Sequence, residues 1–379
     1  MGKLIYIVAA PSSMQSFILP RIAWLKKEYE VVCICSPGPE HEEARKQGLR
    51  TIELPIARRI APRQDLKSLW ALYRALRREK PDMVHSMTPK AGLLGMAAAW
   101  LTGVRVRMHT FTGLIFPWRR GLLHHILKLT DRLTCFFANV INPEGPGVKH
   151  LLEEAHITKK PLHIIANGNI NGVDLQRFEP GRGRSEKRAE LGYGDGDVVF
   201  SFVGRLVADK GIPELVDCFV RLHREHPEAR LLLIGREEPE VDPLPEETRR
   251  QIRQHEAIYC AGSQADVVPW YAASDIYVLP SHREGFCNSL LEAGAMALPC
   301  ITYDVCGCND AVTSECAILV PPYDASALLA ALIRLDKDEL LRHNLGNKAR
   351  RNVEERFSRK LVWGELASFY RQYLNPIEQ

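Results

Sequence analysis

The chain has 379 residues, 46% of them hydrophobic and 25% charged, with a formal net charge of +4. That length predicts two domains, and the near balance of charge gives no indication of nucleic-acid binding. The ten cysteines include no CxxC pair, which favours free thiols in a reducing cytoplasm over a zinc or disulfide framework. No apolar run reaches the length of a transmembrane helix, and the first one predicts a strand, not a signal peptide.

The first half of the chain alternates predicted strands and helices. This alternation predicts a parallel, doubly wound α/β sheet, whose ligands bind at the carboxyl ends of the strands. The strands are expected at 4–10, 31–35, 50–54, 82–85, 104–108 and 135–141, and the helices at 17–28, 42–47, 66–79, 91–101, 122–133 and 147–154. The residues that follow these strands include Ser12, Ser13, Lys90, His109 and Gly113.

The segment 56–80 is both basic and apolar, and two interpretations of it stay open. One is a solvated helix face. The other is contact of residues 56–63 with an anionic membrane or a pyrophosphate-lipid acceptor. Arg58, Arg59, Arg63, Lys67, Arg74, Arg77, Arg78 and Lys80 supply the positive charge.

A Gly- and Asn-rich stretch at 167–174 marks turns, and the polar segment 179–197 is predicted to link two domains. Asp195-Gly196-Asp197 has the spacing of a metal-binding DxD. Its place between a glycine and a predicted strand favours a turn instead.

The second half repeats the alternation. Strands are predicted at 198–203, 230–234, 258–261, 276–280, 299–302 and 317–320, with helices between them. The sequence GRLVADKG, residues 204–211, follows the first of these strands and precedes a helix. Arg205 could fork onto a phosphate, Lys210 could add a point charge, and Gly204 would let the backbone come close.

The sequence SHREGFCNSLLEAGA, residues 281–295, predicts a strand–loop–helix unit with Asn288 or Ser289 as helix cap. Backbone N–H groups at such a helix start bind anions. Glu284 and Glu292 frame this start, and carboxylates beside a phosphate favour hydroxyl groups as partners. The alternative is a solvated loop glutamate and a favourable first-turn glutamate.

GRLVADKG and EGFCNSLLEA together resemble the retaining glycosyltransferases of family 4, including the eight-residue step between the paired glutamates. The resemblance is specific from about residue 169 onward and weaker over the N-terminal half, and it is strongest to the capsular, O-antigen and exopolysaccharide branch. It implies the α/β GT-B fold, with two Rossmann-like domains facing a central cleft. Residues 1–178 would bind the acceptor, 179–360 the nucleotide sugar, and the helix 361–379 would cross back onto the first domain.

The resemblance also implies the reaction: sugar transfer with retention from a nucleoside diphosphate sugar, with UDP expected, to a glycan or lipid-linked acceptor in surface polysaccharide biosynthesis. No metal or cofactor is expected, and the protein is expected in the cytoplasm, with peripheral membrane contact left open. The catalytic group is Arg205, Lys210, Glu284 and His109. The donor-binding group is Gly204, Gly285, Phe286, Asn288, Ser289 and Glu292. The resemblance assigns the nucleotide base to loops that contain Gly235, Arg236, Tyr259 and Gly262. It assigns the acceptor to a surface that contains Ser12, Ser13, Lys90 and Gly113.

Two alternatives stay open. Nucleotide-sugar epimerases share this architecture, and they would convert the donor without any acceptor. A non-catalytic nucleotide-sugar-binding subunit is the other alternative, because the first loop lacks glycine and Cys316 stands where the family commonly has glycine. A dinucleotide oxidoreductase is disfavoured, since no GxGxxG follows the first strand.

Overall fold

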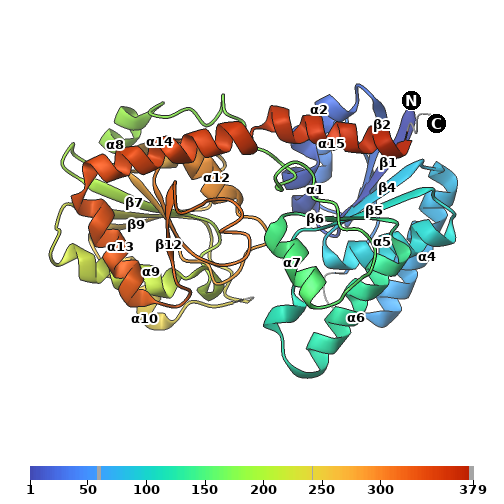
Figure 1. Ribbon diagram of the computed structural model, residues 1–379, viewed down its shortest axis with the longest axis horizontal. Helices are drawn as coiled ribbons and strands as arrows, with labels where there is room; N and C mark the ends of the chain where they lie inside the picture. Colours follow the sequence, from blue (N-terminus) through green and yellow to red (C-terminus); the bar gives the residue numbers. More distant parts are fainter. Residues whose placement is uncertain (58–60, 241, 375–379) are drawn as a thin grey trace. The chain divides into compact units, whose positions relative to one another are not determined.

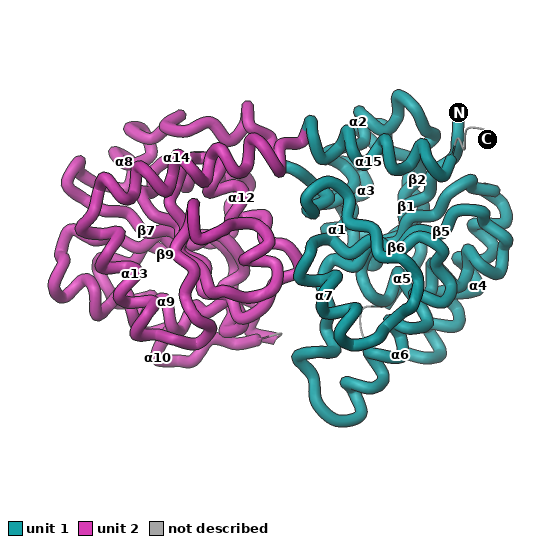
Figure 2. The backbone as a smooth tube through the Cα atoms, viewed as in Figure 1, with its two compact units in different colours: residues 1–172, 360–379 teal, residues 173–359 magenta. Residues whose placement is uncertain are grey.

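The computed structural model describes residues 1–57, 61–240 and 242–374. The chain divides into two compact units, which are coloured separately in Figure 2. Unit 1 consists of Met1–Gly172 together with Lys360–Gln379, and unit 2 of Val173–Arg359. Each unit is built around one six-stranded parallel sheet. No helix of the described ranges is long and apolar enough to cross a lipid bilayer.

The sheet of unit 1 has the strand order β3-β2-β1-β4-β5-β6. Its central strands are buried on both faces, which is the pattern of a parallel sheet covered by helices. The strands are β1 (Gly2–Ile7), β2 (Tyr29–Cys35), β3 (Arg50–Glu53), β4 (Met83–Met87), β5 (Val106–Phe111) and β6 (Val140–Pro143). The helices are α1 (Pro11–Phe17), α2 (Ile22–Leu25), α3 (Glu40–Lys46), α4 (Pro62–Glu79), α5 (Pro89–Leu101), α6 (Gly121–Phe137), α7 (Pro146–Glu154) and the C-terminal α15 (Arg359–Leu374).

Helices α4, α5 and α6 lie side by side on one face of this sheet (Figure 1). The C-terminal helix α15 packs on the opposite face with α1 and α2. The Tyr370 hydroxyl lies 2.7 Å from the Tyr6 hydroxyl and 2.6 Å from His85 Nδ1. At the rim, Arg371 forms an ion pair with Glu28 at 2.6 Å. These contacts join the end of the chain to its first strands.

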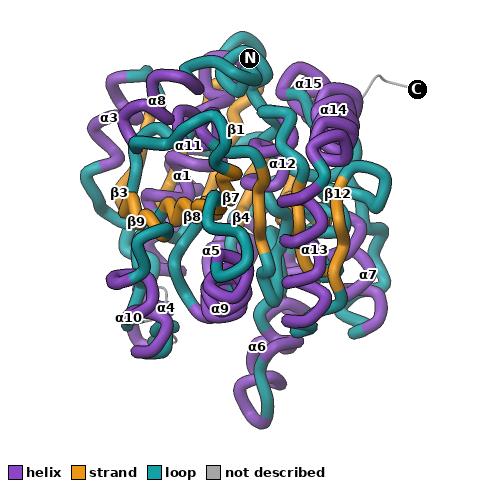
Figure 3. Tube along the Cα trace, turned by 90° about the vertical axis from the view of Figure 1, so that its left-hand side faces the viewer, coloured by secondary structure: helices purple, strands orange, loops and turns teal. Residues whose placement is uncertain are grey.

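The sheet of unit 2 has the order β12-β11-β10-β7-β8-β9. Figure 3 labels β7, β8, β9 and β12 among its strands. Its strands are β7 (Val198–Val203), β8 (Ala229–Ile234), β9 (Ile258–Gly262), β10 (Ile276–Leu279), β11 (Cys300–Tyr303) and β12 (Ala317–Val320). Its helices are α8 (Arg184–Leu191), α9 (Ile212–His223), α10 (Glu246–Gln254), α11 (Val268–Ala273), α12 (Asn288–Ala295), α13 (Ala325–Lys337) and α14 (Glu339–Arg356). The α/β class predicted from the alternation is confirmed for both sheets.

The unit boundary lies between residues 172 and 173, not after residue 178. Val173 N–H donates to Phe357 O at 2.7 Å, and Arg359 N–H donates to Val173 O at 3.0 Å. Phe178 is buried in the core of unit 2. The segment 173–178 therefore belongs to unit 2. The predicted linker 179–197 is not a plain linker either, because it contains the helix α8.

Three local predictions in unit 1 were wrong. Residues 11–16, which lie between the predicted strand 4–10 and the predicted helix 17–28, belong to α1, because Pro11 has the fixed φ that suits a first helical turn. Residues 135–137, expected in a strand, end α6. His109, expected after its strand, lies inside β5, which runs on to Phe111. His109 pairs with Ser86 of β4, so the strand continues past residue 108, where the apolar run ends and the predicted strand stopped.

Candidate active site

The loops that carry the two sequence motifs of unit 2, residues 204–211 and 281–287, meet at the carboxyl ends of β7 and β10. Arg283 contacts Asp209 through two nitrogens, with the shorter distance 2.7 Å. The next residues of the two loops also form an ion pair, between Lys210 Nζ and Glu284 Oε1. Gly211 permits this approach, since a Cβ there would lie 1.9 Å from Pro280 O and its φ is +71°. Two sequence motifs about 75 residues apart thus form one site.

Lys210 and Glu284 are a partly buried ion pair. Each side chain is 14% exposed. Burial alone would lower the pKa of Lys210, but the neighbouring Glu284 carboxylate outweighs it and raises the pKa. Lys210 therefore stays positively charged across the physiological range. The ion pair with Glu284 fixes the position of the Lys210 ammonium group.

Arg205 is held at the rim of the same site. Its guanidinium donates to Glu238 Oε2 at 2.9 Å, and Arg236 donates to the other oxygen of Glu238 at 2.9 Å. The hydrogen bond from Arg205 holds the pKa of Glu238 below its usual range. Because Glu238 has two cationic partners, Arg205 can turn to an incoming anion while Glu238 keeps Arg236. Arg205 is 45% exposed, so it is accessible to such an anion.

Glu292 lies on α12 and is half-buried. Tyr271 Oη donates to Glu292 Oε2 at 3.1 Å. Burial raises the pKa of Glu292 to about 7. The carboxyl group therefore changes charge near neutral pH, and donors from a ligand would favour its ionised form. No motif in the sequence pointed to Tyr271, which stands at one more apolar position of a short helix.

The start of α12 differs from the predicted cap. The N-cap position is Cys287, without a side-chain capping bond, and Asn288 is the first helical residue. The Ser289 hydroxyl lies 3.4 Å from Cys287 Sγ. Phe286, expected at the donor sugar, is buried and packs edge-on against Phe357 with ring centroids 5.6 Å apart. Its ring is therefore part of the core of unit 2.

The loop around Gly307 presses on Glu284 and Gly285. A Cβ on Gly307 would lie 2.8 Å from Gly285 O and 2.9 Å from Glu284 Cβ, and its φ is +82°. Gly307 O also accepts a hydrogen bond from Cys287 N–H at 3.2 Å. The 304–309 loop thus sets the position of the peptide that carries Glu284.

Three of the four residues predicted to bind the base come together. Gly235 N–H donates to Gly262 O at 2.9 Å, and Arg236 O accepts from Leu206 N–H at 2.8 Å. Gly204 adjoins them, because its N–H donates to Ile234 O. Tyr259 is separate from them. It lies three residues before the end of β9 and stacks on Trp270, with ring centroids 5.9 Å apart.

The predicted histidine lies in unit 1. His109 is buried in β5, and its Nδ1 lies 2.8 Å from the Ser86 hydroxyl. Burial lowers the pKa of His109 to about 3. The imidazole is therefore neutral at physiological pH and suits hydrogen bonding, not charge stabilisation. Gly92 of α5 lets the helix pass close to the ring, because a Cβ there would lie 2.4 Å from His109 Cε1.

A pocket of about 320 Å³ opens in unit 1 beside the starts of α1 and α5. Ser13 and Lys90 line it, whereas Ser12 and Gly113 are not among its lining residues. Lys90 Nζ contacts both oxygens of Asp65, at 2.8 and 3.0 Å. The rest of the lining is largely apolar and includes Ile126 and Leu127 of α6. The pocket thus combines a cation with an apolar wall.

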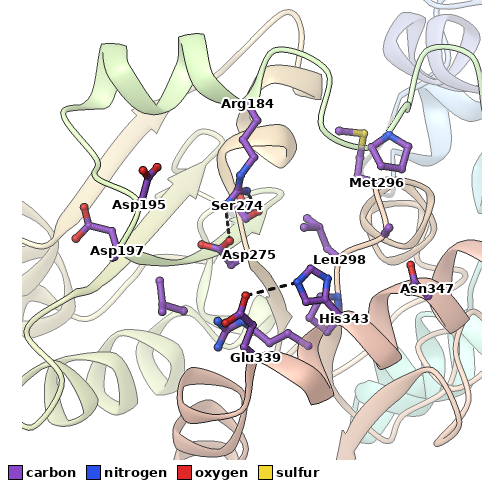
Figure 4. Close-up of a pocket in the computed structure, with 16 residues that line it drawn as sticks. Arg184, Asp195, Asp197, Ser274, Asp275, Met296, Leu298, Glu339, His343 and Asn347 are labelled. Carbon is purple, nitrogen blue, oxygen red and sulfur yellow. Dashed lines mark hydrogen bonds and ion pairs between the residues drawn. The ribbon is translucent and has the colours of Figure 1, made fainter.

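A second pocket, in unit 2, lies at the opposite end of the strands (Figure 4). Its lining includes Val198, Asp275 and Pro299, at the amino ends of β7, β10 and β11. Asp195 and Asp197 line it too, but Asp197 forms an ion pair with Arg230 at 2.8 Å and accepts from Gly194 N–H. No group of three potential metal ligands occurs within the described part of the chain. Asp195-Gly196-Asp197 forms a turn into β7, as its flanks predict.

Comparisons with known proteins fit this geometry. Residues 21–168 match the glycosyl transferase 4-like domain, and residues 183–352 match the glycosyl transferases group 1 family. The capsular polysaccharide biosynthesis glycosyltransferase CapM of Staphylococcus aureus is 32% identical over 93% of this chain and 92% of its own length. An Escherichia coli α-1,3-galactosyltransferase that acts on GlcNAc-diphosphoundecaprenol is 28% identical over 90% of this chain and 87% of its own.

Solved structures support the fold. Anabaena HepE in complex with UDP and glucose aligns with a TM-score of 0.82 at 16% identity, over 98% of this chain and 99% of that one. Sucrose-phosphate synthase of Thermosynechococcus elongatus aligns with a TM-score of 0.81 at 20% identity, over 98% and 99%. Together with the identity to CapM, these matches show that the chain belongs to the group 1, family 4-like glycosyltransferases of the GT-B fold.

Proposed function

We propose that this glycosyltransferase moves a sugar from a UDP-sugar to a lipid-linked acceptor, with retention of anomeric configuration, in surface polysaccharide biosynthesis. One observation carries the proposal. The Asp209–Arg283 and Lys210–Glu284 pairs join the loops 204–211 and 281–287 at the carboxyl ends of β7 and β10. That edge is where parallel sheets bind nucleotides.

In this proposal unit 2 holds the nucleotide. Glu292 accepts hydrogen bonds from the ribose hydroxyls. Arg205 leaves Glu238 for the phosphates, and Lys210 adds a second fixed cation. Backbone N–H groups at Asn288 and Ser289 complete the anion site. These cations offset the charge that develops on the leaving UDP, so the reaction needs no metal ion.

The sugar would lie against Glu284 and the Gly285 peptide. In unit 1, His109 would offer a neutral hydrogen-bonding group to the acceptor. As the glycosidic bond breaks, an oxocarbenium-like centre forms and the electron pair goes to the UDP phosphate oxygen. The acceptor hydroxyl then attacks from the same face and gives up its proton to that oxygen. This order accounts for retention without the carboxylate nucleophile of two-carboxylate glycosidases.

The acceptor is proposed from chemistry and from relatives. The pocket with Ser13 and Lys90 pairs one cation with an apolar wall, which suits a phosphate joined to a hydrocarbon chain. The Escherichia coli relative and a 24% identical Campylobacter jejuni relative are both named for diphosphoundecaprenol substrates. An enzyme acting on such an acceptor would work at the cytoplasmic face of the membrane.

Calorimetric titration with UDP, GDP, ADP and NAD, with and without EDTA, tests the donor site. Tight UDP binding that survives EDTA is the expected result, and loss of binding in EDTA would reject the metal-free mechanism. Preference for NAD or another nucleotide would reject the UDP assignment. NMR of the product made on a diphosphoundecaprenyl-linked sugar then tests retention. Conversion of donor without acceptor would favour an epimerase.

A further inference from the structure

Helix α6 carries its apolar stripe on the outside of unit 1. Leu122 is 75% exposed, Leu129 55% and Phe136 63%. These three residues recur every seven positions and therefore share one helix face. Ile126 and Leu133 lie on the same face and are exposed as well. We call these five residues the α6 ridge. Such a continuous exposed apolar face is uncommon on a soluble monomer and marks an interaction surface.

The opposite face of α6 faces the rest of unit 1. Asp131, Thr134 and Cys135 are buried there. Asp131 lies nine residues after Leu122, which places it on the other side of the helix. The amphipathic pattern is therefore inverted relative to a helix that only covers a core, because the polar groups are enclosed and the leucines face outward.

Within α6 and the turn before it, the exposed charges are all of one sign. Between residues 116 and 137 the cations are Arg119, Arg120, Lys128 and Arg132. The one carboxyl group in that stretch is Asp131, which is buried. Trp118, 45% exposed, precedes the ridge and has the amphipathic ring typical of membrane interfaces. The ridge therefore lies beside an exposed tryptophan and four cations of its own chain segment.

The apolar surface continues onto the neighbouring helix. Trp100, at the end of α5, is 49% exposed, and its ring centroid lies 6.4 Å from that of Phe136. Beyond α5, the outer face of α4 carries exposed Lys67, Arg74 and Arg77. The expected membrane contact of segment 56–63 includes Arg58 and Arg59, which lie outside the described residues. The structure places a row of exposed apolar residues on α6, and Leu66 and Trp70 of α4 are exposed as well.

We propose that the α6 ridge docks on an anionic lipid bilayer. The leucines and Phe136 would enter the headgroup–acyl boundary, while Arg119, Arg120 and Arg132 contact lipid phosphates. A second copy of this chain is a poorer occupant, because two identical ridges would bring their cationic rims together. Ile126 belongs both to the ridge and to the wall of the Lys90 pocket. If the proposed function holds, docking therefore sets that pocket beside the membrane that carries the acceptor.

Sedimentation with vesicles tests the docking. The vesicles contain equal parts of phosphatidylcholine and phosphatidylglycerol, and a second set contains phosphatidylcholine alone. The variant L122Q/L129Q should reduce binding to the anionic vesicles by about tenfold or more. R119Q/R120Q should reduce it severalfold and weaken its dependence on salt. The matched controls are L340Q, which removes an equally exposed leucine from α14, and R351Q; both should bind as the unchanged protein does.

The outcomes separate this proposal from the proposed function. Transfer to a short-chain, water-soluble acceptor should be unchanged in L122Q/L129Q, because neither leucine lines the Lys90 pocket. A protein that ignores anionic vesicles, or an L122Q/L129Q variant that binds them normally, would overturn the docking whatever the activity. A dimer in solution that this variant converts to a monomer would also overturn it, and would assign the ridge to a second copy.

Discussion

Glu292→Gln should stabilise the fold at pH 8 while weakening nucleotide binding. The reason is that burial raises the pKa of Glu292 from 4.5 to about 7. The folded state therefore binds this proton more tightly than the unfolded state. Stability from this group is complete below about pH 4.5 and is lost as the pH rises to about 7, at a cost on the order of 3 kcal/mol. Glutamine carries no charge, and its amide oxygen can still accept from Tyr271 Oη.

Hydrogen exchange measured on peptides of β7 and β10 reports the stability of unit 2 directly. At pH 8 the Gln variant should gain up to about 3 kcal/mol, and near pH 5 the gain should shrink to about 1 kcal/mol or less. Glu355→Gln, on an exposed turn of α14, is the control and should show no such dependence. A Gln variant that is less stable at pH 8 would refute the burial argument.

The same variant should bind UDP about ten- to a hundredfold more weakly, because hydrogen bonds to a charged carboxylate are worth about 1.5–3 kcal/mol. In the unchanged protein, UDP binding near pH 7 should release a proton, since ribose donors favour the ionised form. Titration in buffers of different ionisation enthalpy measures that proton. Unaltered UDP affinity in Glu292→Gln would refute the ribose assignment and leave the stability argument intact.

Three further substitutions test neighbouring contacts. Lys210→Met should cost about 1–3 kcal/mol by leaving Glu284 unpaired, and adding Glu284→Gln should recover most of that loss; a coupling energy near zero in the double-mutant cycle would contradict the pair. Glu238→Gln should tighten UDP binding by up to about fivefold, since the ion pair with Glu238 no longer competes with the UDP phosphates for Arg205. Weaker UDP binding in calorimetry would contradict the proposal that Arg205 moves from Glu238 to the phosphates. Gly307→Ala should cost about 1 kcal/mol or more and raise the KM for the donor, because the added methyl group displaces Glu284; steady-state kinetics with an unchanged KM would disprove this.

Much of the fold could be predicted from the sequence, because local patterns specify it. Apolar runs bounded by turn residues marked all six strands of unit 2, and β7 lies at 198–203 as predicted. In unit 1 the errors concern places where the local pattern is ambiguous. The apolar run at Cys135 suits a helix or a strand, and the packing of α6 on α5 selects the helix.

The sequence by itself determined where the glycines, cations and carboxylates of the candidate site in unit 2 lie along the chain, because residues that follow predicted strands are readable one loop at a time. Only the tertiary structure decided their partners. It paired Lys210 with Glu284 and Arg205 with Glu238, enclosed Glu292 beside Tyr271, and placed Phe286 in the core. It also turned the leucines of α6 outward. Partners and exposure depend on residues distant in the chain, and the free energy of burial that shifts the pKa of Glu292 arises only when those residues exclude water.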